Sequence, residues 1–279
     1  MNFIPTTDLG GSGESIYFLH ANGFPPKIYS PLLEKLTSDF HVKTPLLRPL
    51  WADPPKGKIK TWEPFVDDFI SIIENERGNA YAAGHSFGGT VILLAAIRRP
   101  DLFSKIILLD PVLLSRKLIL PWKFLSFLGL AKYVHPLAKI TRNKRRTFDN
   151  TNTMFGHYRK KEIFKLLDDN SLQAFVEGSV KEAENGTVEL IYSPEWEARI
   201  YLSVMHNDFE IWRGLKDFQV SCLALVAEET DSFVKSSQIR FQELLPKARF
   251  HVLPGTTHLF PLEQPNKVAQ AMKVFLLNG

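Results

Sequence analysis

A serine lies between two glycines in the segment GHSFG, residues 84–88. The apolar residues before it predict the end of a buried strand, and the run GGTVILLAAI after it predicts a helix. This arrangement fits the G-x-S-x-G pattern of a nucleophilic serine in a tight strand-to-helix turn, because flanking glycines relieve crowding and a helix N-terminus favours developing negative charge. A turn serine that bonds only to its own backbone would have the same local sequence. Ser86 is therefore a candidate nucleophile that needs partners.

A nucleophilic serine needs a base, and an acid that orients the base. His258 follows the last predicted strand, where a loop can carry its imidazole over the strand ends, and it is the candidate base. Asp231 follows the preceding predicted strand and is the preferred acid. Glu228 and Glu229, in the same loop, are rival acids.

The oxyanion of a tetrahedral intermediate needs two backbone N–H donors. One candidate is the amide of Phe87, which follows the serine. The other lies in the turn HANGFPP at residues 20–26, where we favour the amide of Asn22, with Ala21 as the nearby alternative. A plain Asn-Gly turn would look the same.

Short apolar runs alternate with helical patterns along the chain, which is typical of an α/β fold with a mostly parallel sheet. Six strands are predicted, at residues 16–20, 41–45, 80–84, 105–110, 222–227 and 249–253. Helices are predicted between them, at residues 61–75, 88–99 and 266–279 among others. The candidate residues all follow predicted strands, so a parallel sheet would gather them at one edge.

About a hundred residues separate the strand that ends at Asp110 from the one near Cys222, which is far too many for one crossover. This segment is predicted to be an inserted subdomain. Residues 116–161 carry twelve Lys or Arg against one acid, and residues 162–210 carry eleven acids against three basic residues. The simplest interpretation is an insert whose two halves pack with opposite charges facing each other.

The composition is that of an ordinary globular protein of 279 residues, with 44% apolar residues, 23% charged residues and a net charge of +4. The charge is a weak argument for nucleic acid, so no nucleic-acid partner is expected. The N-terminal residues lack a secretory signal pattern, and we expect a cytoplasmic protein. The single cysteine, Cys222, lies in a predicted strand and is interpreted as core packing. No pattern predicts a metal site or a cofactor.

Taken together, several segments resemble the capped α/β-hydrolase superfamily: FLHANGFPP, AAGHSFGGTVILLAA, KIILLDPVLL, LALVAEETDS and LPGTTHLFPLEQPNKVAQAMKVFL. The resemblance implies an α/β-hydrolase core at residues 1–112 and 206–279, and a helical cap at residues 113–205. The order Ser86, Asp231, His258 is that of the superfamily. Asp110 is the next choice of acid, because some relatives place theirs after that strand. A serine nucleophile disfavours the dehalogenase and epoxide hydrolase branches, which use aspartate.

The function expected from this resemblance is a cofactor-independent serine hydrolase acting on carboxylic esters through an acyl-enzyme. Aromatic residues of the insert could line an apolar acyl pocket or form the core of the cap: Trp122, Phe124, Phe127, Phe155, Trp196 and Tyr201. A carbon-carbon bond hydrolase using the same triad, with basic cap groups for a substrate carboxylate, and a slow or non-catalytic ligand-binding protein remain alternatives. The expected partner is a small ester or acyl substrate, the chain is a monomer or homodimer, and membrane contact by the basic half of the cap stays open.

Overall fold

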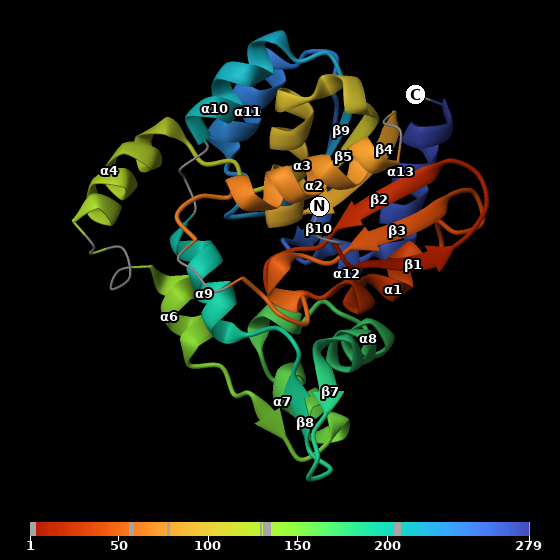
Figure 1. Cartoon of the computed structure of the whole chain (residues 1–279), viewed down its shortest axis with the longest axis vertical. Coiled ribbons are helices and arrows are strands. Elements are labelled where there is room, and N and C mark those ends of the chain that lie inside the picture. Colours follow the sequence, from red (N-terminus) through yellow and green to blue (C-terminus); the bar gives the residue numbers. More distant parts are fainter. Residues whose placement is uncertain are drawn as a thin grey trace.

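The computed structural model describes residues 4–55, 59–76, 79–128, 130, 135–203 and 208–278. Within these residues the main sheet has seven strands in the order β1-β3-β2-β4-β5-β9-β10 (Figure 1). Their bounds are β1 Thr6–Gly10, β2 Ser15–Leu19, β3 His41–Pro45, β4 Ala80–His85, β5 Phe103–Leu109, β9 Ser221–Glu229 and β10 Arg249–Thr257. All neighbours pair in parallel except β1 and β3. The predicted α/β fold and its six strands are confirmed.

The strand β1 was not predicted. Its sequence TTDLG is polar, and its first three residues are exposed, so it carries no alternating apolar pattern. It is held at the sheet edge by antiparallel pairing with β3, with Thr7 opposite Thr44. This pairing is a long-range backbone contact, which the local sequence does not reveal.

Helices cover both faces of the sheet. Along β5, Ile106 and Leu108 belong to one buried cluster, and Ile107 and Leu109 belong to the other, as the two-residue period of a strand requires. The first cluster includes residues of α2 Glu63–Asn75, α3 Phe87–Arg98, α10 Asp208–Gly214 and α11 Lys235–Leu244. The second includes residues of α1 Ser30–Leu33, α12 Phe260–Glu263 and α13 Pro265–Asn278. Figure 1 shows α2 and α3 in front of the sheet.

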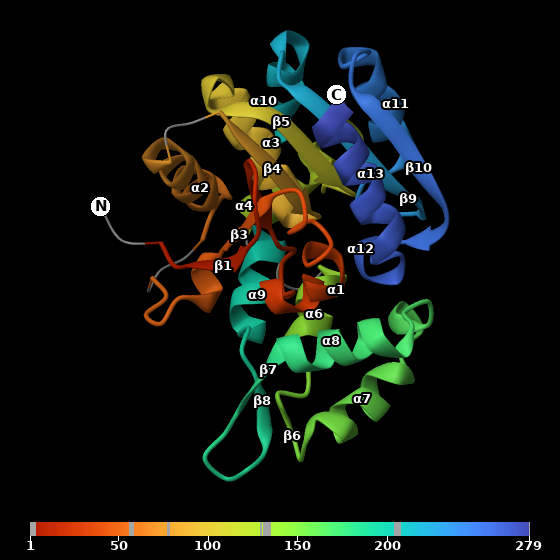
Figure 2. The same ribbon diagram turned by 90° about the vertical axis from the view of Figure 1, so that its right-hand side faces the viewer.

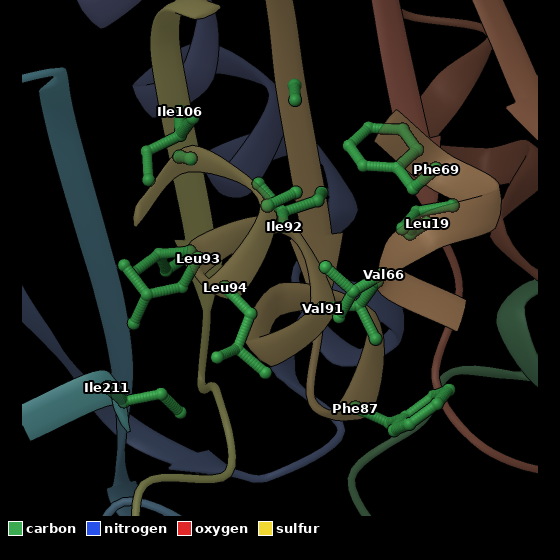
Figure 3. Packing of buried hydrophobic residues seen from close by; sticks show 14 of the residues in the cluster. Leu19, Val66, Phe69, Phe87, Val91, Ile92, Leu93, Leu94, Ile106 and Ile211 are labelled. Carbon is green, nitrogen blue, oxygen red and sulfur yellow. The ribbon is translucent and has the colours of Figure 1, made fainter. Parts of the chain in front are cut away.

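The helix α3 is almost completely buried. Its residues from Val91 to Ala96 have no exposed area, and they pack against Val66 and Phe69 of α2, Ile106 of β5 and Ile211 of α10 (Figure 3). A helix enclosed in this way has a fixed position relative to the sheet. Its N-terminus, where Ser86 lies, is fixed with it.

The insert between β5 and β9 contains the helices α4 Arg116–Phe127, α6 Pro136–Arg142, α7 Thr151–Arg159, α8 Asp169–Ser179 and α9 Pro194–Leu202. The part of the insert from α6 to α9 forms the lower part of the molecule in Figure 2. The insert also contains a small antiparallel sheet, which was not predicted, with the order β6 Thr147–Phe148, β8 Val188–Leu190, β7 Val180–Glu182. Short 3-10 helices complete the chain: η1 Pro26–Tyr29, η2 Arg48–Leu50, η3 Pro100–Leu102, η4 Glu162–Phe164 and η5 Leu215–Asp217. The predicted domain boundary between residues 205 and 206 lies outside the described residues.

Opposite charges from the two halves of the insert do meet, as predicted. Lys144 pairs with Glu197 at 2.6 Å, Arg159 pairs with Asp169 at 2.5 Å, and Arg146 pairs with Glu195. Each pair joins the basic first half to the acidic second half.

Among the described helices, none combines the length and the apolar composition that are needed to span a bilayer.

Candidate active site

Ser86 lies in a strained turn between β4 and α3. Its φ of 54° falls in the left-handed region, which a non-glycine residue rarely adopts. The glycines around it are required by close packing: a Cβ atom at Gly88 would lie 2.3 Å from the carbonyl oxygen of Leu19, and one at Gly84 would lie 2.7 Å from that of Gly88. The serine side chain is held at the carboxyl edge of the sheet because strand and helix approach so closely.

The structure brings Ser86, His258 and Asp110 into one hydrogen-bonded chain. His258 Nδ1 lies 2.6 Å from Asp110 Oδ2, and His258 Nε2 lies 2.9 Å from Ser86 Oγ. The carboxylate can only accept, so Nδ1 carries the proton and Nε2 is free to accept from the serine hydroxyl. This is the geometry of a serine activated by an oriented histidine.

The preference for Asp231 as the acid is corrected by this geometry. Asp231 is exposed, and its carboxylate accepts a hydrogen bond from the adjacent Ser232 hydroxyl. Asp110 is fully buried and directed at His258 from the turn after β5. The loop after β9 contributes Thr230 instead, whose hydroxyl donates to Asp110 Oδ2 at 2.7 Å. Glu228, a rival acid, accepts from the amide of Gly255.

Backbone geometry explains why Asp110 reaches the histidine. Its φ of 44° is left-handed, so the chain turns sharply where β5 ends. Thr90 of α3 fixes the next residues, because its hydroxyl donates to the carbonyl of Val112 and accepts from the amide of the same residue. These contacts join residues that are separated in sequence. The only sequence signal for Asp110 as the acid was therefore its position at the end of a predicted strand.

A buried relay of hydrogen bonds connects the turn at residues 20–26 to His258. The amide of Ala21 donates to Tyr29 Oη, and Tyr29 Oη lies 2.8 Å from His85 Nδ1. His85 Nε2 lies 2.9 Å from the carbonyl of His258, so Nε2 carries the proton and Nδ1 accepts from the tyrosine. Burial and the nearby His258 hold the pKa of His85 well below its usual value, which keeps the ring neutral. His85 therefore supports the backbone of His258.

Asn22 is the remaining candidate of that turn for an oxyanion donor, since the amide of Ala21 is already bonded to Tyr29. The side chain of Asn22 is buried and contacts the insert at both ends. Its Nδ2 donates to the carbonyl of Glu197, and its Oδ1 accepts from the hydroxyl of Tyr192. The insert therefore holds the turn that carries the Asn22 amide.

The side chain of Glu197 packs directly against this turn. A Cβ atom at Gly23 would lie 2.5 Å from the Glu197 carboxyl carbon, so a larger residue does not fit there. Lys144 Nζ binds both carboxylate oxygens at 2.6 and 2.7 Å, and Thr141 donates to one of them. A buried charge is thus paired and hydrogen-bonded, as its desolvation requires.

The sequence also singled out Cys222 and a group of aromatic residues of the insert. Cys222 is buried in β9, and burial raises the pKa of its thiol, so it is core packing as predicted. Trp196 is buried in the insert. Phe124 and Phe127 contradict the prediction of a pocket or cap core, because they are 63% and 86% exposed on α4.

Comparison with known proteins shows to which family the chain is similar. The sequence profile described as the alpha/beta hydrolase family matches residues 16–271. The chain is 31% identical over 105 residues to the strigolactone esterase D14 of Arabidopsis thaliana, covering 36% of this chain and 39% of that protein. It is 27% identical over 129 residues to the type I acyl-CoA thioesterase mpaH of Penicillium brevicompactum, covering 40% of this chain and 30% of that protein. These matches span less than half the length of either relative.

Solved structures share the fold over nearly the whole chain. The crystal structure of E-2-(acetamidomethylene)succinate hydrolase superposes with a TM-score of 0.79 at 18% identity, covering 97% of this chain and 94% of that one. Identity at this level supports the common fold, and the chemistry has to be argued from the site itself.

Proposed function

The chain belongs to the alpha/beta hydrolase family, and we propose that it is a serine hydrolase that cleaves carboxylic esters of apolar acyl groups through an acyl-enzyme. The observation that carries the proposal is the continuous contact from Ser86 Oγ through His258 to the buried Asp110. The names of the two relatives, an esterase and a thioesterase, support acyl transfer over other hydrolytic chemistry.

In the proposed reaction, Ser86 Oγ attacks the acyl carbonyl while His258 Nε2 accepts its proton. Asp110 holds the imidazole in the required tautomer and stabilises the imidazolium that forms. The amides of Asn22 and Phe87 donate to the oxyanion. His258 then protonates the leaving alcohol. Water, activated by the same histidine, releases the acid from Ser86.

The carbon-carbon hydrolase alternative has less support from the site. It would use basic groups of the insert to bind a substrate carboxylate. Three of these groups, Lys144, Arg146 and Arg159, are already paired with acids of the insert, whereas Lys139 and Arg142 are exposed on α6. We therefore place ester cleavage first.

The deciding experiment is reaction of the full chain with a fluorophosphonate probe, followed by peptide mass spectrometry. Labelling is expected at Ser86, with hydrolysis of p-nitrophenyl esters in a series from acetate to long acyl chains. Ser86→Ala should lose both labelling and turnover. Heat-unfolded protein is the control, because an unactivated serine does not react.

Two other outcomes have distinct meanings. Labelling without turnover of any ester would contradict the proposed substrate class and favour a ligand-binding protein. Full ester hydrolysis by Ser86→Ala would show that the proposed nucleophile is wrong.

A further inference from the structure

One face of α4 presents large apolar side chains to solvent. Leu120, Phe124 and Phe127 are 64%, 63% and 86% exposed, and their spacing of four and three residues places them on one side of the helix. The chain continues with the exposed residues Leu128 and Leu130. The other side of α4 is the one that packs: Ile119 is buried, and Trp122 lies edge-on to His135 with ring centroids 5.0 Å apart. The exposed face is therefore not needed to fix the helix.

The short helix α6 extends this surface. His135, which Trp122 contacts, is the N-cap of α6, so the two helices are neighbours. Leu137 and Ile140 of α6 are also exposed. Figure 1 shows α4 projecting from the body of the molecule on the side where α6 lies. We call the exposed apolar residues Leu120, Phe124, Phe127, Leu128, Leu130, Leu137 and Ile140 the α4 surface. Single exposed apolar residues are ordinary, but a contiguous group marks a surface that meets a partner.

The segment that carries the α4 surface is basic in sequence. Lys139 and Arg142 of α6 are exposed, and none of the ion pairs among the described residues involves them. The sequence of α4 adds Arg116, Lys117 and Lys123 and contains no acid. Farther along the insert, Lys144, Arg146 and Arg159 are paired with acids of the second half.

We propose that the α4 surface docks on an anionic lipid bilayer. An exposed apolar helix face in a basic segment is suited to that environment, because apolar side chains can enter the acyl boundary while cations of the segment are attracted to anionic headgroups. A second copy of this chain is a poorer fit, because a two-fold contact would bring the same positive charges against each other. The inference does not depend on the proposed ester hydrolysis.

Vesicle cosedimentation tests the proposal on the 279-residue chain carrying Ser86→Ala, so that lipid hydrolysis cannot intervene. We expect binding to vesicles of phosphatidylcholine mixed with phosphatidylglycerol, weaker binding to phosphatidylcholine alone, and release at high salt. The double variant Phe124→Ser/Phe127→Ser should weaken binding more than about tenfold, because two exposed rings no longer enter the bilayer. Lys139→Glu/Arg142→Glu should weaken binding to anionic vesicles by about tenfold or more and abolish the preference over neutral ones.

Matched control variants lie on the exposed side of α11, outside the insert. Ile239 is 49% exposed and Lys235 is exposed, so Ile239→Ser and Lys235→Glu make the same kinds of change outside the α4 surface. Neither should alter vesicle binding. Equal loss of binding in these controls would overturn the assignment to α4.

A site-specific label gives a second readout. Cys222 is buried with a raised thiol pKa, so a polarity-sensitive dye will react at an introduced cysteine. Dye at Phe127→Cys should shift to the blue on anionic vesicles, and dye at the exposed Ser236→Cys of α11 should not. Absence of the shift at position 127 would overturn the proposal. So would a lipid-free dimer, in sedimentation velocity, that Phe127→Ser dissociates, because a second copy would then cover the surface.

Discussion

The insert contacts its surroundings in two opposite ways. Where α9 meets the core, polar side chains are buried, among them Asn22 and Glu197. On α4, apolar side chains such as Phe124 and Phe127 are exposed. Both arrangements are unfavourable unless a partner satisfies them. At α9 the partner is the core, and this contact between α9 and the core, which we call the seam, holds the site in place. At α4 no described part of the chain supplies a partner for the apolar side chains. Burial of polar groups therefore indicates positioning, and exposure of apolar groups indicates docking.

The largest effect is expected at Asp110, the buried polar residue that contacts His258. Asp110→Asn should lower kcat by about 10³ to 10⁴-fold, because the amide no longer stabilises the imidazolium or selects the tautomer. Asp231→Asn should keep activity within about twofold, since its exposed carboxylate does not contact His258 in the structure. Steady-state kinetics on one soluble ester measure both. A large loss of kcat in Asp231→Asn, with little loss in Asp110→Asn, would show that the acid is Asp231 in the loop after β9.

Asp110 and Asp231 also mark the limit of prediction from sequence. The strands and the Ser86 turn were predictable because apolar period and glycine spacing are local signals. Both aspartates follow strands that end at the same edge of the sheet, so strand order alone cannot distinguish them. The choice depends on the turn at Asp110 and on its contact with Thr230, which join distant segments. The exposure of α4 was equally hidden, because an apolar helical pattern normally predicts burial.

The second effect concerns stability at the seam. Glu197→Gln should lower the free energy of unfolding by about 3 kcal/mol, because Lys144 then loses the charge that compensates its partly buried ammonium. The control is Glu195→Gln, whose pair with Arg146 is about half exposed and is worth at most about 1 kcal/mol. Urea unfolding measures both variants. Equal losses would show that burial does not make the Lys144–Glu197 pair more important for stability than the exposed Arg146–Glu195 pair.

Asn22→Ala tests whether the seam positions the oxyanion turn. The change leaves the Tyr192 hydroxyl and the Glu197 carbonyl without their partner. We expect the substitution to displace the backbone amide of residue 22. Because this amide would stabilise the oxyanion only in the transition state, kcat should fall about 10 to 100-fold with little change in KM. Tyr192→Phe removes one of the two contacts and should have a smaller effect of the same kind. A rise in KM with kcat unchanged would contradict a positioning role and favour simple substrate binding.

The pH dependence of stability should reflect the buried histidines beside the site. Burial lowers the pKa of His20 to about 4 and holds that of His85 well below its usual value. In the unfolded chain both titrate near about 6.5, so below that pH the unfolded state binds protons that the folded state does not. Stability is therefore complete above pH 7 and falls as the pH decreases, by about 1.4 kcal/mol per histidine at pH 5.5.

Urea unfolding at pH 7.5 and 5.5 measures this slope. The window lies above the range in which most carboxylates titrate, so the histidines dominate it. His20→Gln should reduce the loss by about 1.4 kcal/mol, because this buried group no longer titrates. An unchanged loss would mean that His20 does not contribute.

The smallest effect is expected on α4 in the absence of lipid. Phe127→Ala removes a ring that is 86% exposed, so the free energy of unfolding should change by less than about 0.5 kcal/mol. Phe148→Ala, in the same insert, removes a ring that is 1% exposed and should cost about 3 to 5 kcal/mol, because it leaves a cavity. A large loss at Phe127 would show that the ring is packed inside the protein in solution. A neutral result means that folding does not require the exposed face of α4, which leaves its apolar character to be explained by a partner outside the chain.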